Sequence, residues 1–214
     1  MVQPLAEPAT EGLQRLRMTY QEYLERFDEN THVEWADGEA IVFMPPNEAH
    51  QDIVTFLVTL LRLYVDIRGL GMVLTAPFEL RLPTGPSREP DILFLTREHY
   101  DRRTRERWVG PADLLVEVQS EGTARYDVRE KLPDYERSGV REYWAIDPRP
   151  CHRTFRPFIL TGSQHYEEAP LDEQGRFHSV VLPGFWLDPG WFWQDPLPKT
   201  IDLIMTIAPD AFRL

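Results

Sequence analysis

The stretch DLLVEVQSEG, residues 113–122, decides the fold expected for this chain. Its apolar residues are typical of a strand inside a sheet, yet Glu117 stands in the middle and Gln119 follows shortly after. A buried carboxylate is costly unless it has a partner. Glu117 therefore requires a proton, a cation or a hydrogen-bond donor close by.

The segments around this strand predict an α/β fold. Residues 20–27 follow a capping-box pattern, which predicts a short helix, and an Asp-Gly turn predicts a hairpin at residues 33–44. Residues 50–67 have apolar side chains on nearly every face and should form a long, deeply buried helix that ends at a pair of glycines. Residues 72–82 and 90–95 are strand candidates.

The residues after this strand complete the expected domain. Residues 126–140 are helix-like although they contain Pro133, and residues 142–147 predict another strand. The order of elements predicts one mixed sheet flanked by helices. We expect a flexible tail at residues 1–17 and a single domain at residues 18–214.

The composition excludes several classes of protein. Hydrophobic residues make up 42% of the chain, enough for a substantial core. No apolar run reaches the roughly 18 to 20 residues of a membrane helix, and the N-terminus lacks the pattern of a secretion signal. The single cysteine, Cys151, excludes an intramolecular disulfide and fits the reducing cytoplasm, where we expect the protein.

The formal net charge of -12 argues against a surface that is positive throughout. A role with nucleic acids would therefore need a local basic surface. Residues 97–108 offer one candidate, because arginines alternate there with Tyr100 and Trp108. The acids in the same segment dilute this charge, so a solvated surface remains the other interpretation.

Asp91 forms a second acidic interruption, at the start of the predicted strand 90–95. If that strand pairs with residues 113–120, alternation brings the carboxylate of Asp91 close to that of Glu117. Two adjacent carboxylates repel unless a proton or a cation lies between them, and Mg²⁺ prefers oxygen ligands. Alternatively, Asp91 caps a strand end and Glu117 faces a partner such as an arginine.

The segments EPDILFL, DLLVEVQS and YDVREKLPDYERSGVREYWAIDP resemble the Uma-type family of restriction endonucleases, within the PD-(D/E)XK nuclease superfamily. The hairpin and long helix at residues 33–61 and the segment FHSVVLPGFWLD extend the similarity, which covers about residues 18–190. The resemblance implies a restriction-endonuclease-like core, in which a mixed sheet is flanked by helices.

The resemblance also implies a metal site for Mg²⁺ or Mn²⁺. Asp91, Glu117 and the main-chain carbonyl of Val118 would hold the ion. The superfamily usually has a lysine two positions after the glutamate, but here the residue is Gln119, which carries no charge. Lys131 matches a lysine with which the family compensates, although it could instead form a surface ion pair with its i−4 neighbour.

Other acids near the expected site carry weaker signals. Glu48 lies at the start of the long helix, where the superfamily often places an acidic residue near the metal, and His50 matches a histidine of the family. The alternatives are a solvated acid at a helix N-terminus and a structural histidine. Glu34 and Glu39, in the hairpin, are weaker candidates still.

The function expected from this resemblance is metal-dependent endonuclease cleavage of DNA. Gln119 and the acidic charge also permit a second hypothesis, a weakened nuclease fold that acts as a binding or interaction module. A nuclease acting on RNA or on a branched structure is a third. The Trp-rich segment 184–198 either covers the core or forms the surface of a homodimer, which would suit the cutting of two strands.

Overall fold

Two large β-sheets organise the part of the chain that the structure describes. The computed structural model describes residues 13–28 and 31–212, in which two six-stranded mixed sheets and a two-stranded sheet form. The N-terminal sheet has the order β1-β3-β2-β6-β5-β8, and the central sheet has the order β12-β11-β10-β9-β7-β4. The strands of the N-terminal sheet are β1 (Leu13–Arg17), β2 (Val33–Ala36), β3 (Glu39–Phe43), β5 (Glu79–Arg81), β6 (Ser87–Arg88) and β8 (Arg107–Val109). Those of the central sheet are β4 (Gly71–Thr75), β7 (Ile92–Thr96), β9 (Leu114–Val118), β10 (Glu142–Asp147), β11 (Thr154–Leu160) and β12 (Tyr166–Glu168).

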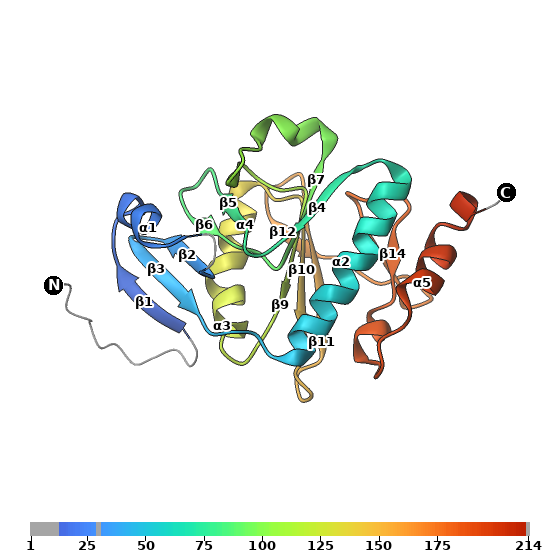
Figure 1. The fold of residues 1–214 in the computed structure, drawn as a ribbon. Coiled ribbons are helices and arrows are strands. Elements are labelled where there is room, and N and C mark those ends of the chain that lie inside the picture. Colours follow the sequence, from blue (N-terminus) through green and yellow to red (C-terminus); the bar gives the residue numbers. More distant parts are fainter. Residues whose placement is uncertain (1–12, 29–30, 213–214) are drawn as a thin grey trace.

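The helices cover both faces of the central sheet (Figure 1). On one side lie α4 and, beyond it, the N-terminal sheet with α1; on the other lie α2 and then α5. The α-helices are α1 (Tyr20–Arg26), α2 (Glu48–Arg68), α3 (Ala124–Tyr126), α4 (Leu132–Ser138) and α5 (Thr200–Ile207). A π-helical turn, Asp127–Lys131, and three 3₁₀ segments, Arg97–Arg102, Pro189–Trp193 and Pro209–Phe212, complete the helical elements of the described residues. The expected α/β class with flanking helices is confirmed, and a second large sheet is added to it.

The register of the central sheet brings the two predicted acids together. Strands β7 and β9 pair in antiparallel fashion, with Ile92 opposite Val116. One step further along this register, Asp91 faces Glu117. Parallel pairing of β9 with β10 places Ala145 on the other side of Glu117. The strand pairing that the sequence predicted is therefore present.

Alternation divides the side chains of the central strands between two apolar clusters. Ile92, Phe94, Leu114 and Val116 pack with the buried face of α2. The opposite face packs against α4 through the cluster that includes Leu115 and Tyr135. Glu117 shares the parity of Leu115 and therefore points toward α4.

Helix α2 confirms the long helix but corrects its predicted burial. It begins after Asn47, whose side chain accepts a hydrogen bond from the amide of His50, and ends at Gly69 in the left-handed conformation. Its burial pattern leaves Asp52 and Arg62 exposed, so one face meets solvent. The helix is amphipathic because its polar residues recur on that single face.

Pro133 divides the helical segment that follows β9. A π-helical turn at Asp127–Lys131 separates α3 from α4, and the amide of Leu132 donates to the carbonyl of Asp127, five residues earlier. Proline offers no amide hydrogen, and its ring clashes with the carbonyl four residues before it. The wider π turn accommodates this clash, and such turns are frequent at functional sites.

The observed strands bear on two other expectations. Part of the tail expected at residues 1–17 lies outside the described residues, but its last five residues form strand β1, paired with β3. The strand expected at residues 72–82 is divided at Pro77 into β4 and β5, which belong to different sheets. The predicted division of the chain into a tail and a single domain stays a prediction.

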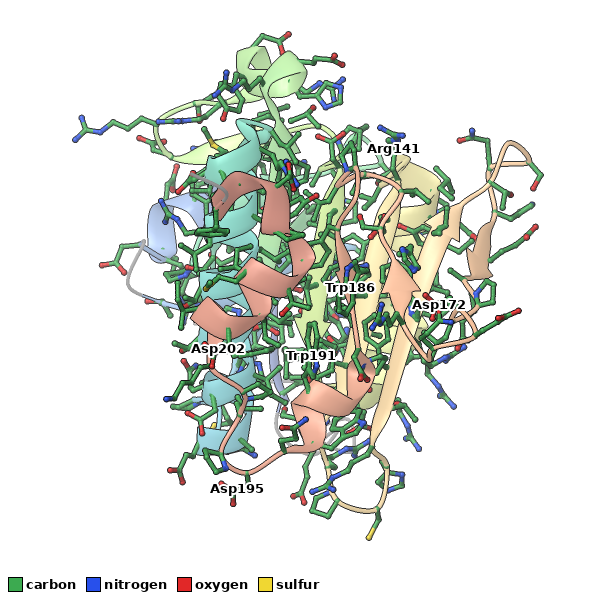
Figure 2. The ribbon with its side chains drawn as sticks, turned by 90° about the vertical axis from the view of Figure 1, so that its right-hand side faces the viewer. Arg141, Asp172, Trp186, Trp191, Asp195 and Asp202 are labelled. Atoms are coloured by element: carbon green, nitrogen blue, oxygen red, sulfur yellow. The ribbon has the colours of Figure 1, made fainter. Side chains whose placement is uncertain are left out.

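The C-terminal segment lies across α2 and the adjoining face of the central sheet (Figure 2). It contains β13 (Phe177–His178), β14 (Trp186–Leu187) and α5. Trp191 and Phe192 are buried in the main apolar cluster, and Trp186 packs against it. The segment therefore covers the core, which was one of the two interpretations of its tryptophans. Within the described ranges, no helix is both long and apolar enough to cross a membrane.

Candidate active site

A cavity of about 200 Å³ lies where β7, β9 and the π turn meet. Asp91, Glu117, Val118 and Lys131 line it together with His50 from the first turn of α2. The end of the hairpin closes another side through Phe43 and Met44. Segments far apart in the chain therefore bring most of the predicted site residues to one place.

Asp91 is held at the start of β7 by two contacts on the same oxygen. Its Oδ2 accepts a hydrogen bond of 2.7 Å from the amide of Val118 and lies 3.2 Å from Nε2 of His50. Val118 lies two residues beyond Val116, the last residue of β9 that pairs with β7, so the carboxylate takes the place of a backbone acceptor for its amide. His50 thus orients a site acid.

Glu117 is 3% exposed, and its contacts also fall on one oxygen. Its Oε1 accepts hydrogen bonds from Nζ of Lys131 at 3.0 Å and from the hydroxyl of Tyr135 at 2.6 Å. Burial raises the pKa of Glu117 well above its ordinary value, although the Lys131 ammonium opposes this. The partner that the sequence required for this acid is a lysine on the neighbouring helix.

The Lys131 ammonium lies among three carboxylates. Its Nζ is 2.8 Å from Oε1 of Glu34, 3.0 Å from Oε1 of Glu117 and 3.6 Å from Oδ1 of Asp127. Burial lowers the pKa of an amine, but these carboxylates outweigh it and raise the pKa of Lys131. Lys131 is 2% exposed, so the interpretation as a surface ion pair is wrong, although the contact with Asp127 exists.

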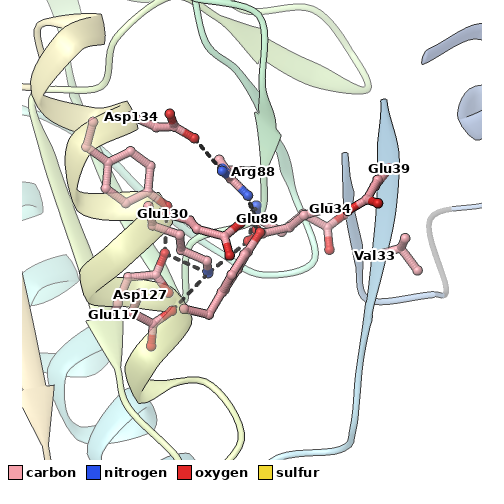
Figure 3. Close-up of polar contacts among 12 residues, drawn as sticks. Val33, Glu34, Glu39, Arg88, Glu89, Glu117, Asp127, Glu130 and Asp134 are labelled. Carbon is pink, nitrogen blue, oxygen red and sulfur yellow. Dashed lines mark hydrogen bonds and ion pairs between the residues drawn. The ribbon is translucent and has the colours of Figure 1, made fainter. Parts of the chain in front are cut away.

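Glu34 is the most strongly ionised acid of this group. Burial would raise its pKa, but Lys131 and Arg88 hold the pKa at about 2. Figure 3 shows Glu34 approaching from the hairpin, while Glu117 and Asp127 come from the opposite side. Burial raises the pKa of Asp127 to about 6, against the opposing effect of Lys131. The hairpin therefore supplies the counter-ion that keeps the lysine charged.

Arg88 is a site-supporting residue that the sequence did not reveal. Its guanidinium is 1% exposed and lies 3.1 Å from Oε2 of Glu34; it also contacts Asp134 of α4 and the hydroxyl of Tyr126. It lies in a two-residue strand, which is too short to show the alternation of polar and apolar residues that would indicate a buried position. Lys131 did carry a signal, because it and Lys199 are the only lysines among the 23 basic residues.

Three of the predicted residues lie elsewhere. Gln119 is buried, and its amide donates to the carbonyl of Ile146 at 2.7 Å, but it lines a neighbouring, larger cavity. Glu48 is exposed and lines a different cavity together with Phe192. Glu39 forms an ion pair with Arg15 at 3.3 Å. The structure does not bring these three to the cavity of Asp91 and Glu117.

The chemistry of the cavity fits a hydrated cation better than a complete protein cage. Across residues 13–28 and 31–212, no three His, Cys, Asp or Glu side chains are grouped so that they could hold a metal ion. In the same residues, the hydrogen bonds of Asp91 and Glu117 occupy Oδ2 and Oε1 alone, which leaves one carboxylate oxygen of each available. A Mg²⁺ ion needs only one or two carboxylates, with waters and a substrate phosphate as further ligands.

Buried atoms without hydrogen-bond partners support the same fit. Nδ1 of His50 and Oδ1 of Asp127 have no hydrogen-bond partner among the described residues. The carboxylates near the cavity outnumber the two cations, Lys131 and Arg88, and the raised pKa values of Glu117 and Asp127 follow from burial together with this excess of negative charge. A divalent cation would restore the balance.

Comparisons with known proteins identify a family for this chain and, separately, a solved structure of similar fold. A model of the family Uma2, described as "Putative restriction endonuclease", matches residues 19–190. Among solved structures, a "putative nuclease belonging to DUF820" from Anabaena variabilis is 18% identical with a TM-score of 0.65. The match covers 82% of this chain and 97% of that one, and at this identity it supports the fold alone. The search of curated proteins finds no match.

Proposed function

The chain belongs to the Uma2 family, "Putative restriction endonuclease", and from this premise we propose that it hydrolyses phosphodiester bonds of DNA with a divalent cation. The observation that carries the proposal is the convergence of Asp91, Glu117 and Lys131 on one cavity. An acid pair on adjacent strands with a lysine 3.0 Å from one of them combines oxygen ligands with a positive charge.

Each residue has a role that follows from its contacts. Asp91, Glu117 and the main-chain carbonyl of Val118 would hold Mg²⁺ or Mn²⁺, whose chemistry there is to acidify a water and to offset charge on the phosphate. Lys131 donates to a nonbridging phosphate oxygen and stabilises the charge that develops on it. His50 orients Asp91, and Tyr135 orients Glu117. Gln119 contributes at most a hydrogen bond to water or phosphate.

The proposal is tested by incubating the purified protein with plasmid DNA and Mg²⁺ or Mn²⁺. We expect cleavage that stops on chelation and in Asp91→Asn. Glu167→Gln serves as the matched control, since this acid is exposed on β12, at the edge of the central sheet, and does not line the cavity. Cleavage that persists in Asp91→Asn and in the presence of chelator would refute the assignment.

Gln119 supports a second candidate function. With no lysine at this position and no complete cage of metal ligands among the described residues, the fold would also suit a binding module that does not cleave. Calorimetric titration with Mn²⁺ separates the two candidates. Heat of binding that disappears in Asp91→Asn and Glu117→Gln favours the nuclease, and its absence in the unmodified protein favours the module.

The substrate and the assembly are further parts of the proposal. The same assay run on RNA and on branched DNA decides between the nucleic acids, for which the cavity offers no criterion. A homodimer would place two sites on one duplex and so permit cutting of both strands. Sedimentation velocity decides this, with one boundary at twice the monomer mass of 25.1 kDa as the expected result.

A further inference from the structure

A second and much larger cavity adjoins the candidate active site. Its volume is about 1440 Å³. Gln119 and Tyr126 line it, while Glu117, Val118 and Asp127 line the small cavity, so residues 117–127 form a wall common to both. A molecule that occupied the larger cavity would lie against the other side of the chain segment that carries Glu117.

Arginine dominates the lining of this cavity. Six arginines face it against three carboxylates, in a chain whose formal net charge is -12. The arginines are Arg15, Arg125, Arg129, Arg149, Arg153 and Arg156, and together we call them the arginine cleft. Positive charge is therefore concentrated next to the candidate site, although the protein as a whole is acidic.

Half of these arginines have no partner among the residues that the structure describes. Arg149 pairs with Asp147 at 2.7 Å, and Arg156 pairs with Glu168 at 2.9 Å. Arg125, Arg129 and Arg153 are exposed, and no side-chain hydrogen bond or ion pair involves them in the described part of the chain. They come from α3, the π turn and the segment before β11, so their side chains are available to an anion from two sides of the cleft.

The cleft offers few surfaces for stacking. Tyr126 is buried, and Arg15 already covers its ring at 5.6 Å. Among the described residues that line the cleft, His152 is the one exposed aromatic ring, whereas proteins that hold single strands use several exposed aromatic rings on which successive bases stack. With one such ring beside six arginines, the lining favours contacts with phosphates, which occur on both strands of a duplex.

We propose that the arginine cleft binds the phosphate backbone of duplex DNA next to the scissile phosphate. The inference rests on the proposed function, because it places the substrate of that site, but it predicts binding whether or not cleavage occurs. Arg125, Arg129 and Arg153 make the contacts that position the duplex. The common wall then directs one phosphate toward Asp91 and Glu117.

The test replaces the three unpaired arginines with glutamine, in R125Q/R129Q/R153Q. The matched control is R97Q/R103Q/R105Q, which removes three exposed arginines from the segment 97–108. That segment lies at the opposite end of the central sheet from α3 (Figure 1). Both triple variants remove the same formal charge, so a difference between them reports position rather than net charge.

Binding is measured by fluorescence anisotropy with a labelled duplex in Ca²⁺ at several salt concentrations, with circular dichroism to verify folding. For the cleft variant we expect affinity to fall about tenfold or more and the salt slope to decrease by about 0.9 for each phosphate that the variant no longer neutralises. The control should bind as the unmodified protein does. Equal binding by the cleft variant and the unmodified protein, or weaker binding in the control alone, would overturn the proposal.

Additional probes separate this proposal from the proposed function. Single-stranded DNA of the same length should bind more weakly than duplex DNA, and a preference for the single strand contradicts the inference. If the unmodified protein binds duplex through these arginines but cleaves nothing with any divalent cation, the cleft is supported and the nuclease assignment fails. If the cleft variant cleaves as fast as the unmodified protein at low DNA concentration, the cleft proposal fails and the nuclease assignment stands.

Discussion

The two adjoining cavities differ in how their charges are held. In the small cavity, Lys131 is buried and each of its carboxylate contacts is within 3.6 Å. In the arginine cleft, Arg125 and Arg129 are exposed and free of partners in the described residues. Buried charges act strongly on one another and must be balanced, whereas exposed charges are screened by salt and act on a mobile ligand. We propose that this difference separates a site for chemistry from a site for binding, and each expected effect below tests that proposal.

The largest effect is expected from Lys131. We expect Lys131→Met to reduce cleavage by about 10²–10³-fold, the scale seen when one stabilising donor is removed. Lys131→Arg keeps the charge but replaces a compact ammonium with a larger planar group. Single-turnover cleavage at saturating DNA should separate the two variants, with partial activity in the arginine variant. Full activity in Lys131→Met contradicts a catalytic role for the ammonium.

The next effect concerns the stability of the buried network. Glu34→Gln removes the carboxylate shared by Arg88 and Lys131, and we expect the free energy of unfolding to fall by about 3–5 kcal/mol, since two buried cations lose a counter-ion. Urea denaturation at neutral pH measures this change. Glu39→Gln, on the more exposed side of the same hairpin, should change stability by less than about 0.5 kcal/mol. Similar losses of unfolding free energy in the two variants would contradict the expectation that the buried carboxylate stabilises the fold more than the partly exposed one.

A smaller effect should follow the pH. Burial and the nearby Glu34 raise the pKa of Glu89 to about 8, so the folded protein holds a proton that the unfolded chain releases near pH 4.5. The contribution of Glu89 to the free energy of unfolding is therefore fully present below pH 4.5 and is lost as the pH rises toward 8. Glu89→Gln should therefore raise the free energy of unfolding by roughly 1–3 kcal/mol at pH 8.5 and by little at pH 4. An effect independent of pH contradicts a protonated Glu89.

The smallest effect is expected in the arginine cleft. Arg125→Gln should alter the free energy of unfolding by less than about 0.5 kcal/mol, because the side chain is exposed and unpaired within the described ranges. The melting temperature in calorimetry, compared with that of Glu34→Gln, checks this expectation. A large drop in stability would show that this arginine supports the fold, and the contrast between the two cavities would then disappear.

Local patterns account for most of the elements found in the structure. The capping box at Thr19 and Glu22 is present, with the Thr19 hydroxyl accepting from the amide of Glu22. The Asp-Gly turn joins β2 and β3, with φ of 50° and 81° at its two residues. These features were predictable because their physical cause lies within a few neighbouring residues.

The candidate site was only partly predictable, since its contacts are long-range. Asp91 and Glu117 could be paired from strand alternation, and Lys131 came from the resemblance. Arg88 and the counter-ion role of Glu34 could not be foreseen, because their contact brings together positions 54 residues apart. Glu48 was placed near the site by analogy, but the helix turns its side chain to another cavity.

The π turn at Asp127–Lys131 has a consequence for comparison with relatives. A π turn amounts to one residue inserted into an α-helix, and each residue of an α-helix turns the following positions by about 100°. The π turn takes up this additional residue within a single turn, so the residues after it, Tyr135 among them, keep the direction that they would have in a regular helix one residue shorter. A relative that lacks one residue here, and the proline at position 133, would therefore still direct the matching tyrosine toward the site glutamate, and a gap of one residue in an alignment of this helix marks the loss of the bulge rather than the loss of that contact.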